Sequence, residues 1–305
     1  IITFDMGGTS ADVSIIDGTA NYSTENKIGD FPVIIPAIDV TAIGAGGGSI
    51  AWLDDSGILK VGPESAGAMP GPVSYKRGGQ RATTTDAYVC LGFMSKFQLL
   101  DGEMEIYPEL AEKALQEIGD GIGLSVEETA QAIVDVATAN MYAQFIPLMA
   151  KNGVDPRDYA MLAYGGAGPT HAFILAREVG IRKVIVPATP GTLCAMGSAY
   201  ANLKQDYIYT TYKLLDEFAP GELSGVFEQL KRKGTEWIRR EAASGVALTA
   251  TDYEYSLDMR YDGQAFELKV VITEEQFEKQ EQILERFHAL YKSLFGIEMK
   301  ESRVA

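Results

Sequence analysis

The sequence predicts an α/β protein with a mixed sheet, followed by a smaller α+β region. Two observations carry this prediction. At the start, apolar and β-prone runs at residues 1–4 and 13–16 flank a glycine-rich turn, as in neighbouring strands of a meander. Later, a strand at 159–164 leads through several glycines into a helix at 170–179 and a second strand at 183–186. This order is typical of a strand–helix–strand unit with a parallel portion.

The residues between these two stretches have patterns of their own. Residues 50–61 surround an Asp-Asp-Ser-Gly turn and are expected to form a hairpin, and a long Gly- and Pro-rich loop follows at 62–79. A short helix is predicted at 87–94, with Asp86 as its N-cap. Apolar residues at helical spacing predict a further helix at 107–118.

A capping box begins the longest predicted helix. Ser125 is expected to be its N-cap and Glu128 its third residue. Apolar residues then recur at helical spacing until Asn152-Gly153, a pair that ends helices. Residues 191–203 are expected to form an apolar helix.

The last part of the chain is predicted to be α+β. A charged helix at 223–243 precedes a strand–turn–strand pair within 253–272, and a second capping box at 273–276 is expected to begin the last helix. We therefore divide the chain into a larger region, residues 1–215, and a C-terminal region, residues 216–305.

Composition excludes several classes of protein. The chain has 305 residues, of which 46% are hydrophobic, which is enough apolar surface for a folded core. Its 26 Lys and Arg against 42 Asp and Glu give a net charge of −16. This acidic balance disfavours nucleic-acid and anionic-membrane binding, because phosphate contacts need clustered basic residues. No apolar run approaches the roughly 20 residues that span a bilayer.

Cysteine and histidine are scarce. Cys90 and Cys194 are far apart in apolar contexts, so we expect two reduced core residues of a cytoplasmic protein. The two histidines, His171 and His288, disfavour a histidine-based metal site but leave a carboxylate magnesium site open. We expect His288 at the surface or partly buried.

The first motif with chemical meaning is Asp5-Met6-Gly7-Gly8-Thr9-Ser10, with Asp12 shortly after it. Glycines let the backbone approach an anion closely, and exposed amides supply hydrogen-bond donors. A carboxylate repels phosphate, so Asp5 and Asp12 would hold Mg²⁺ or its water molecules. The alternative is a hairpin turn that only needs glycines. The carboxylates and hydroxyls together favour a phosphate site.

Three further glycine-rich segments leave two interpretations each. Gly165-Gly166-Ala167-Gly168 lies between a predicted strand and helix, where it could present a helix N-terminus to a nucleotide or only allow close packing. His171, in the first helical turn, is as easily a packing residue as a functional one. The loops at 44–49 and 65–72 are either surface loops or a wall that contacts a ligand or partner.

Six stretches, in order along the chain, resemble the hydantoinase A/5-oxoprolinase family, which includes ATP-dependent hydantoinases and ketone carboxylase subunits. They are FDMGGTSADVSII (4–16), IGAGGGSIAW (43–52), VGPESAGAMPGP (61–72), TTTDAYVCLG (83–92), YGGAGPTHA (164–172) and DMRYDGQAFEL (258–268). The family has the actin/sugar-kinase/Hsp70-like ATPase fold, with a ribonuclease H-like mixed sheet and ATP between two lobes.

The resemblance implies roles for individual residues. Asp5 and Asp12 would be the catalytic carboxylates nearest Mg²⁺. The remaining implied nucleotide contacts are Gly7, Gly8, Thr9 and Ser10 in a phosphate loop, Gly46 and Gly47 in the next loop, and Gly165, Gly166, Gly168 and His171 on the adenosine side.

The sequence departs from the family pattern in two places. Family members carry an earlier lobe with its own D-x-G-G-T-F-T-D-type motif, which is not found before Ile1, so we expect the chain to be the C-terminal lobe of a longer protein. The family's usual D-V-H-T run reads Asp39-Val40-Thr41-Ala42 here, so Thr41 replaces a histidine.

The resemblance implies an enzyme that uses ATP to phosphorylate a small cyclic amide or imide for ring opening. Its expected partners are the absent N-terminal lobe and a hydantoinase B-type subunit or domain. A ketone carboxylase subunit, a small-molecule kinase of the same fold and a non-catalytic partner-binding subunit are the alternatives. The long Gly- and Pro-rich segment at 44–79 favours the hydantoinase family over the kinase.

Overall fold

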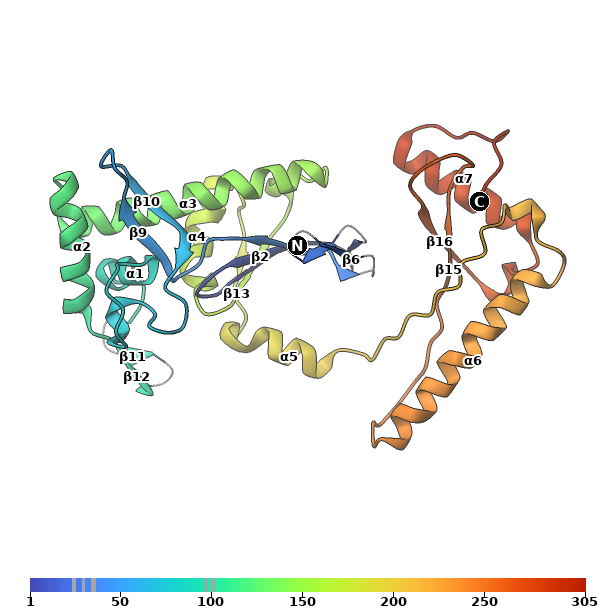
Figure 1. The fold of residues 1–305 in the computed structure, drawn as a ribbon, viewed down its shortest axis with the longest axis horizontal. Helices are drawn as coiled ribbons and strands as arrows, with labels where there is room; N and C mark the ends of the chain where they lie inside the picture. The colour runs from blue at the N-terminus through green and yellow to red at the C-terminus, as the bar shows by residue number, and fades with distance from the viewer. Residues whose placement is uncertain (24–25, 29–30, 34–36, 96–97, 100–101) are drawn as a thin grey trace. The chain divides into compact units, whose positions relative to one another are not determined.

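The computed structural model describes residues 1–305 except 24–25, 29–30, 34–36, 96–97 and 100–101. The chain folds into two compact units, Ile1–Ala201 and Asn202–Ala305, each with its own core (Figure 1). The sequence-based division at residue 215 lies slightly further along the chain and stays a prediction.

A mixed sheet forms the centre of the first unit. Its strand order is β14-β13-β1-β2-β3, and β8 also pairs with β2. The pairs β1/β13 and β13/β14 are parallel, whereas the pairs that involve β2 are antiparallel. The strands are β1 (Ile2–Met6), β2 (Ala11–Asp17), β3 (Thr19–Ala20), β8 (Thr41–Ile43), β13 (Met161–Tyr164) and β14 (Val184–Ile185). The predicted combination of a glycine-turn hairpin and a parallel strand–helix–strand unit is confirmed.

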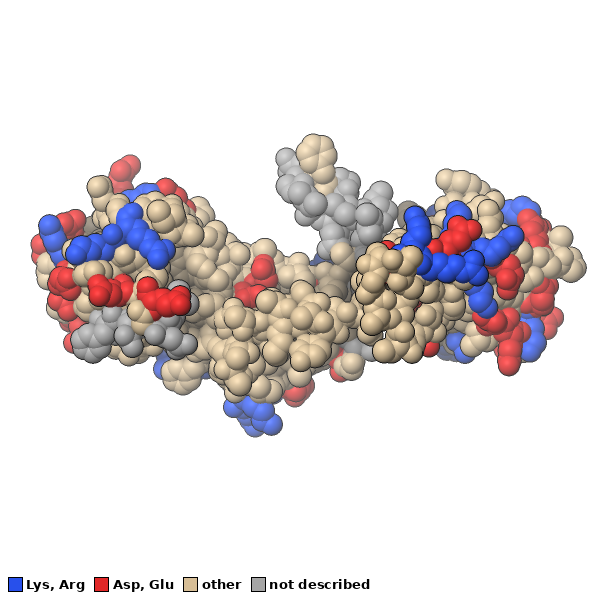
Figure 2. Space-filling view, turned by 90° about the horizontal axis from the view of Figure 1, so that it is seen from below, with Lys and Arg blue, Asp and Glu red and all other residues tan. Residues whose placement is uncertain are grey.

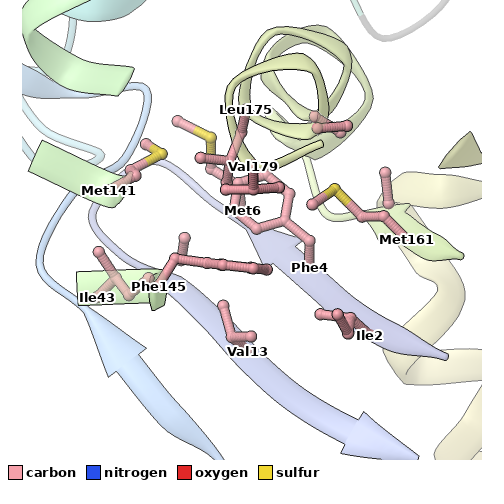
Figure 3. Packing of buried hydrophobic residues seen from close by; sticks show 14 of the residues in the cluster. Ile2, Phe4, Met6, Val13, Ile43, Met141, Phe145, Met161, Leu175 and Val179 are labelled. Atoms are coloured by element: carbon pink, nitrogen blue, oxygen red, sulfur yellow. The ribbon is translucent and has the colours of Figure 1, made fainter. Parts of the chain in front are cut away.

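The two faces of this sheet differ in chemistry because side chains alternate along each strand. Ile2, Phe4 and Met6 of β1 are fully buried in an apolar core, which Figure 3 shows from close by. Helices α3 (Val126–Lys151) and α4 (Gly168–Val179) supply the other side of that core. Thr3 and Asp5 therefore point to the opposite face of the sheet, which becomes the polar one.

A second apolar core lies between the hairpin of β9 (Ser49–Leu53) and β10 (Leu59–Ser65) and three helices. These are α1 (Thr84–Leu91), α2 (Pro108–Ile122) and the first half of α3. The predicted capping box at Ser125 and Glu128 is present at the start of α3. Shorter strands are β4 (Tyr22–Ser23), β5 (Asn26–Ile28), β6 (Phe31–Val33), β7 (Ala37–Ile38), β11 (Gln98–Leu99) and β12 (Met104–Glu105).

The N-cap prediction for Asp86 is wrong. Thr83 caps α1, and Asp86 is the third helical residue, which completes a capping box with Thr83. The Asp86 carboxylate is fully buried and accepts hydrogen bonds from the backbone of Val73, Ser74 and Thr83. A buried carboxylate needs several hydrogen-bond donors. The amides of Val73 and Ser74 supply two of them, which connects the Gly- and Pro-rich loop 62–79 to α1.

The second unit pairs β15 (Tyr255–Met259) with β16 (Leu268–Ile272) and packs α6 (Glu222–Ala243) and α7 (Gln280–Phe295) around them. The capping box at Thr273 begins a short 3₁₀ turn, and α7 starts only at Gln280. His288 is buried and bonds the Tyr261 hydroxyl at 2.7 Å, so the expected surface or partly buried position is also wrong. None of the helices described is long and apolar enough to cross a membrane.

Phe145 and Phe173 offer a matched test of the first core. Phe145, on α3, is 0% exposed, whereas Phe173, on α4, is 63% exposed. We expect Phe145→Ala to lower the free energy of unfolding by about 3–5 kcal/mol, because it removes buried apolar area and leaves a cavity. Phe173→Ala should change it by less than about 1 kcal/mol. Urea unfolding measures both, and equal losses would contradict this core.

Candidate functional site

Three glycine-rich loops meet at one edge of the central sheet. The loop 7–10 follows β1, the loop 165–167 follows β13, and the loop 44–48 follows β8. Because β1 and β13 are parallel neighbours, their carboxyl ends lie at the same edge. The Ala167 amide donates to the Met6 carbonyl at 2.8 Å, and the Gly47 amide donates to the Gly7 carbonyl at 3.0 Å.

The loop 7–10 exposes backbone donors at its tip. The Gly7 amide bonds the Ser10 carbonyl at 3.0 Å, which closes the turn. Gly8 and Thr9 are exposed, and within the described residues their backbone N–H groups have no acceptor in the protein. Neighbouring free amides of this kind are suited to bind an anion.

The loop 44–48 lies behind this tip and supports it. A Cβ atom on Gly46 would lie 2.7 Å from backbone atoms of both Gly8 and Thr9, so only glycine fits there. Gly46 and Gly47 are buried, and their amides donate to Ser49 Oγ and to the Gly7 carbonyl. Gly46 and Gly47, both predicted to contact the nucleotide, thus support the loop that carries the free amides of Gly8 and Thr9.

Two hydroxyl residues complete the support. Sequence reasoning gave Thr85 no role here and placed Ser65 in a loop that is either at the surface or a wall for a ligand or partner. The Thr85 amide and hydroxyl both donate to the Gly47 carbonyl, at 2.7 and 2.8 Å. Ser65 Oγ lies 3.3 Å from Thr9 Oγ1 and accepts from the Gly67 amide at 3.1 Å. The start of the Gly- and Pro-rich loop 62–79 therefore contacts the tip of the loop 7–10.

Asp5 and Asp12 lie directly opposite each other on β1 and β2. Partial burial raises the pKa of Asp12, and the negative charge of Asp5 raises it further. A divalent cation between the two would relieve this repulsion. Among the residues whose placement is described, no group of three or more His, Cys, Asp or Glu side chains could hold a metal. Two carboxylates fit Mg²⁺, which keeps several waters and takes further ligands from phosphate.

Tyr164 and Cys194 border the two carboxylates. Tyr164 of β13 pairs in register with Asp5, and burial, followed by the charge of Asp5, raises the pKa of its hydroxyl. The Cys194 thiol donates to Asp5 Oδ2 at 3.1 Å. Cys194 is exposed and Cys90 is only partly buried, so the prediction of two core cysteines is wrong.

Cys194 belongs to α5 (Leu193–Tyr200), which is shorter than the helix predicted at 191–203. Every residue of α5 is at least partly exposed, and the sequence of the helix contains no charged residue. The surface around it, which faces the viewer in Figure 2, is mostly uncharged. The polar face of the sheet is therefore bordered by a neutral helix.

The loop 165–167 serves close packing and also leaves one glycine free. Gly165 has φ +85°, and a Cβ atom there would lie 2.3 Å from Asp5 Oδ1. Gly168 is the buried first residue of α4 and lies against the backbone of Phe4. Gly166 is exposed, with open space where its side chain would be. Of the three glycines, Gly166 is the one available to a ligand.

His171 has its side chain in the interior, while its backbone amide donates to the Ala167 carbonyl of the loop 165–167 at 3.2 Å. Its side chain is 0% exposed, and its ring nitrogens lie 2.7 Å from the Tyr88 hydroxyl and 3.3 Å from Thr138 Oγ1. Burial lowers the pKa of His171 to about 4. The arrangement joins α1, α3 and α4 through a neutral imidazole.

The glycines of the loop 44–48 allow a controlled test of the loop contact. Gly46→Ala should lower the free energy of unfolding by about 1–3 kcal/mol, because the new methyl group overlaps the backbone of the loop 7–10. Gly44→Ala is the control, since no atom lies within 4 Å of its added Cβ. Chemical denaturation compares the two, and an undisturbed Gly46→Ala variant would argue against the contact.

His171 should stay neutral through the physiological range and gain its proton only near pH 4. In the unfolded chain it protonates near its ordinary value of 6.5, so the unfolded state binds more protons between these limits. The stability contributed by His171 is therefore present above pH 6.5 and is lost as the pH falls toward 4. Proton–nitrogen NMR of the two histidine rings, recorded as a function of pH, measures the protonation midpoint of His171. A midpoint near 6.5 would contradict the lowered pKa.

Comparison with known proteins finds one family along most of the chain. A family model described as hydantoinase/oxoprolinase matches residues 1–207. The chain is 36% identical to the caprolactamase α subunit of Pseudomonas jessenii over 310 residues, which cover 100% of the chain and 44% of that subunit. It is 35% identical to the acetophenone carboxylase γ subunit of Aromatoleum aromaticum, over 87% of the chain and 37% of that subunit.

Two solved structures match the fold over nearly the whole chain. The crystal structure of ATP-dependent caprolactamase from P. jessenii matches with a TM-score of 0.72 and 34% identity, over 100% of the chain and 45% of the caprolactamase chain. Nucleotide-free acetone carboxylase matches in fold, with a TM-score of 0.79 and 24% identity, over 99% of the chain and 45% of its own. The predicted actin-like ATPase fold is confirmed. The chain spans less than half the length of each of these relatives.

Proposed function

The chain belongs to the hydantoinase/oxoprolinase family, and we propose that it forms the nucleotide-binding lobe of an ATP-dependent enzyme that opens a cyclic amide. The observation that carries this proposal is the position of two free loop amides beside a pair of opposed carboxylates. Free amides suit phosphate and paired carboxylates suit Mg²⁺, so together they suit a magnesium nucleotide.

In this proposal each residue has one task. The amides of Gly8 and Thr9 bind phosphate oxygens, and Asp5 and Asp12 hold Mg²⁺, which offsets the charge of the phosphates. Gly166, at the exposed turn before α4, lies on the adenosine side. Gly7, Ser10, Gly46, Gly47, Gly165, Gly168 and His171 shape or support the loops.

Phosphorylation solves a chemical problem of amides, whose carbonyl carbon is a poor electrophile. The γ-phosphoryl group moves from ATP to the amide oxygen, and ADP leaves. Water then adds to the activated carbon and the ring C–N bond breaks. A second water releases inorganic phosphate from the resulting acyl phosphate, which leaves the open amino acid. Donors already in place on the loop 7–10 lower the cost of placing the phosphoryl charge.

The remaining parts of the enzyme are also proposals. The caprolactamase relative is named as a subunit, and the chain covers 44% of it, which supports an N-terminal lobe and a hydantoinase B-type partner as the other components. The acetophenone carboxylase relative, at 35% identity, supports a second candidate, ATP-dependent activation of a ketone for carboxylation. A cytoplasmic location stays a prediction from the two cysteines, which are expected to be reduced.

The phosphate site predicts a stabilising response to Mg²⁺-ADP. At 100 times its dissociation constant, a ligand that binds only the folded chain raises the free energy of unfolding by about 2.7 kcal/mol. Asp5→Asn should abolish this Mg²⁺-dependent gain, because one of the two carboxylates is lost. Asp17→Asn, at the exposed far end of β2, is the matched control and should keep the gain. Thermal and urea unfolding with and without Mg²⁺-ADP measure the gain in the wild type and in both variants.

A gain that survives Asp5→Asn would refute the assignment of the carboxylates. If the wild-type chain shows no gain, the partner-binding alternative is favoured over the nucleotide site. In the full-length protein with its partner, ATP hydrolysis stimulated by a lactam supports ring opening. Stimulation only by a ketone with bicarbonate supports the carboxylase.

A further inference from the structure

Asp5 is held from two sides by groups that follow β13 in the chain. Gly165 brings its α-carbon so close that an added Cβ would lie 2.3 Å from Asp5 Oδ1. On the other oxygen, the Cys194 thiol donates to Oδ2 at 3.1 Å. The Asp5 carboxylate is thus confined between a glycine and a thiol.

The position of Cys194 is itself fixed by the same glycine loop. The Gly165 amide donates to the Pro190 carbonyl at 3.0 Å, and Pro190–Thr192 form a 3₁₀ turn that leads directly into α5. Since every residue of α5 is at least partly exposed, burial of the helix does not force the thiol onto Asp5. The contact is a hydrogen bond between the Cys194 thiol, whose helix follows the anchored 3₁₀ turn, and the Asp5 carboxylate on β1.

We propose that Cys194 is a positioning residue that orients the Asp5 carboxylate toward a cation shared with Asp12. This proposal rests on the proposed function. A thiol suits the task because it is a neutral donor that fixes a carboxylate without cancelling its charge, whereas Lys or Arg would compete with the cation. Groups that orient metal ligands from outside affect metal affinity by about 10- to 100-fold.

The metal affinity of cysteine variants tests the proposal. Mn²⁺ is the probe, and electron paramagnetic resonance measures its binding to the 305-residue chain with ADP. Cys194→Ala should weaken Mn²⁺ binding about tenfold. Cys194→Ser, which restores a neutral donor, should come back to within about twofold of the wild type. ADP affinity without metal should be equal in all variants, which a general loss of structure would not allow.

Cys90→Ser is the matched control, because Cys90 is the other cysteine of the chain and lies on α1. It should leave Mn²⁺ binding unchanged. It also leaves Cys194 as the single thiol, so its infrared S–H stretching band reports on Cys194 alone. A hydrogen bond to Asp5 lowers the frequency of that band, and the double variant Cys90→Ser/Asp5→Ala should raise it again.

The two measurements separate the possible failures. Equal Mn²⁺ affinity in Cys194→Ala and the wild type would overturn the positioning role. An S–H band that does not respond to Asp5→Ala would overturn the contact itself. If the band responds but the wild type binds no Mn²⁺ with ADP, the contact stands, and the proposed function fails together with the role given to Cys194.

Discussion

The site depends on a contact between two loops that only glycine permits. The loop 44–48 presses its backbone against the loop 7–10, and the Gly47 amide bonds the Gly7 carbonyl at 3.0 Å. A side chain at Gly46 would meet the backbone of the opposite loop at 2.7 Å and push it away. Gly46 packs against the peptide between Gly8 and Thr9, yet no described residue accepts a hydrogen bond from the amides of Gly8 and Thr9. The loss of conformational freedom that these glycines suffer on folding is therefore the cost of a close contact between two loops.

Much of the fold follows from the sequence because it rests on local signals. The capping box at Ser125 and the glycine turn after β1 both form where the pattern predicts them. Asp86 shows the limit of such reasoning. It lies next to residues that can cap a helix, and only the folded chain shows that its carboxylate also serves the distant amides of Val73 and Ser74.

The candidate site also has parts that local sequence signals predict and parts that only the folded chain shows. Asp5 and Asp12 could be paired from the sequence, since a short turn between antiparallel strands brings them opposite each other. The sequence could not separate glycines that contact a ligand from glycines that support a loop, because both carry the same residue type. The contact between Cys194 and Asp5 could not be predicted from the sequence. Cys194 meets Asp5 across 189 residues of chain, and its apolar neighbours favour the core.

The same long-range contact couples the carboxylate pair to α5. An eight-residue helix whose residues are all partly exposed gains little from burial, and isolated helices of that length are marginal in water. The 3₁₀ turn before it is held by the bond from Gly165 to Pro190, and its second residue, Cys194, contacts Asp5. The contact between the Cys194 thiol and the Asp5 carboxylate therefore connects the start of this uncharged helix to the polar face of the sheet.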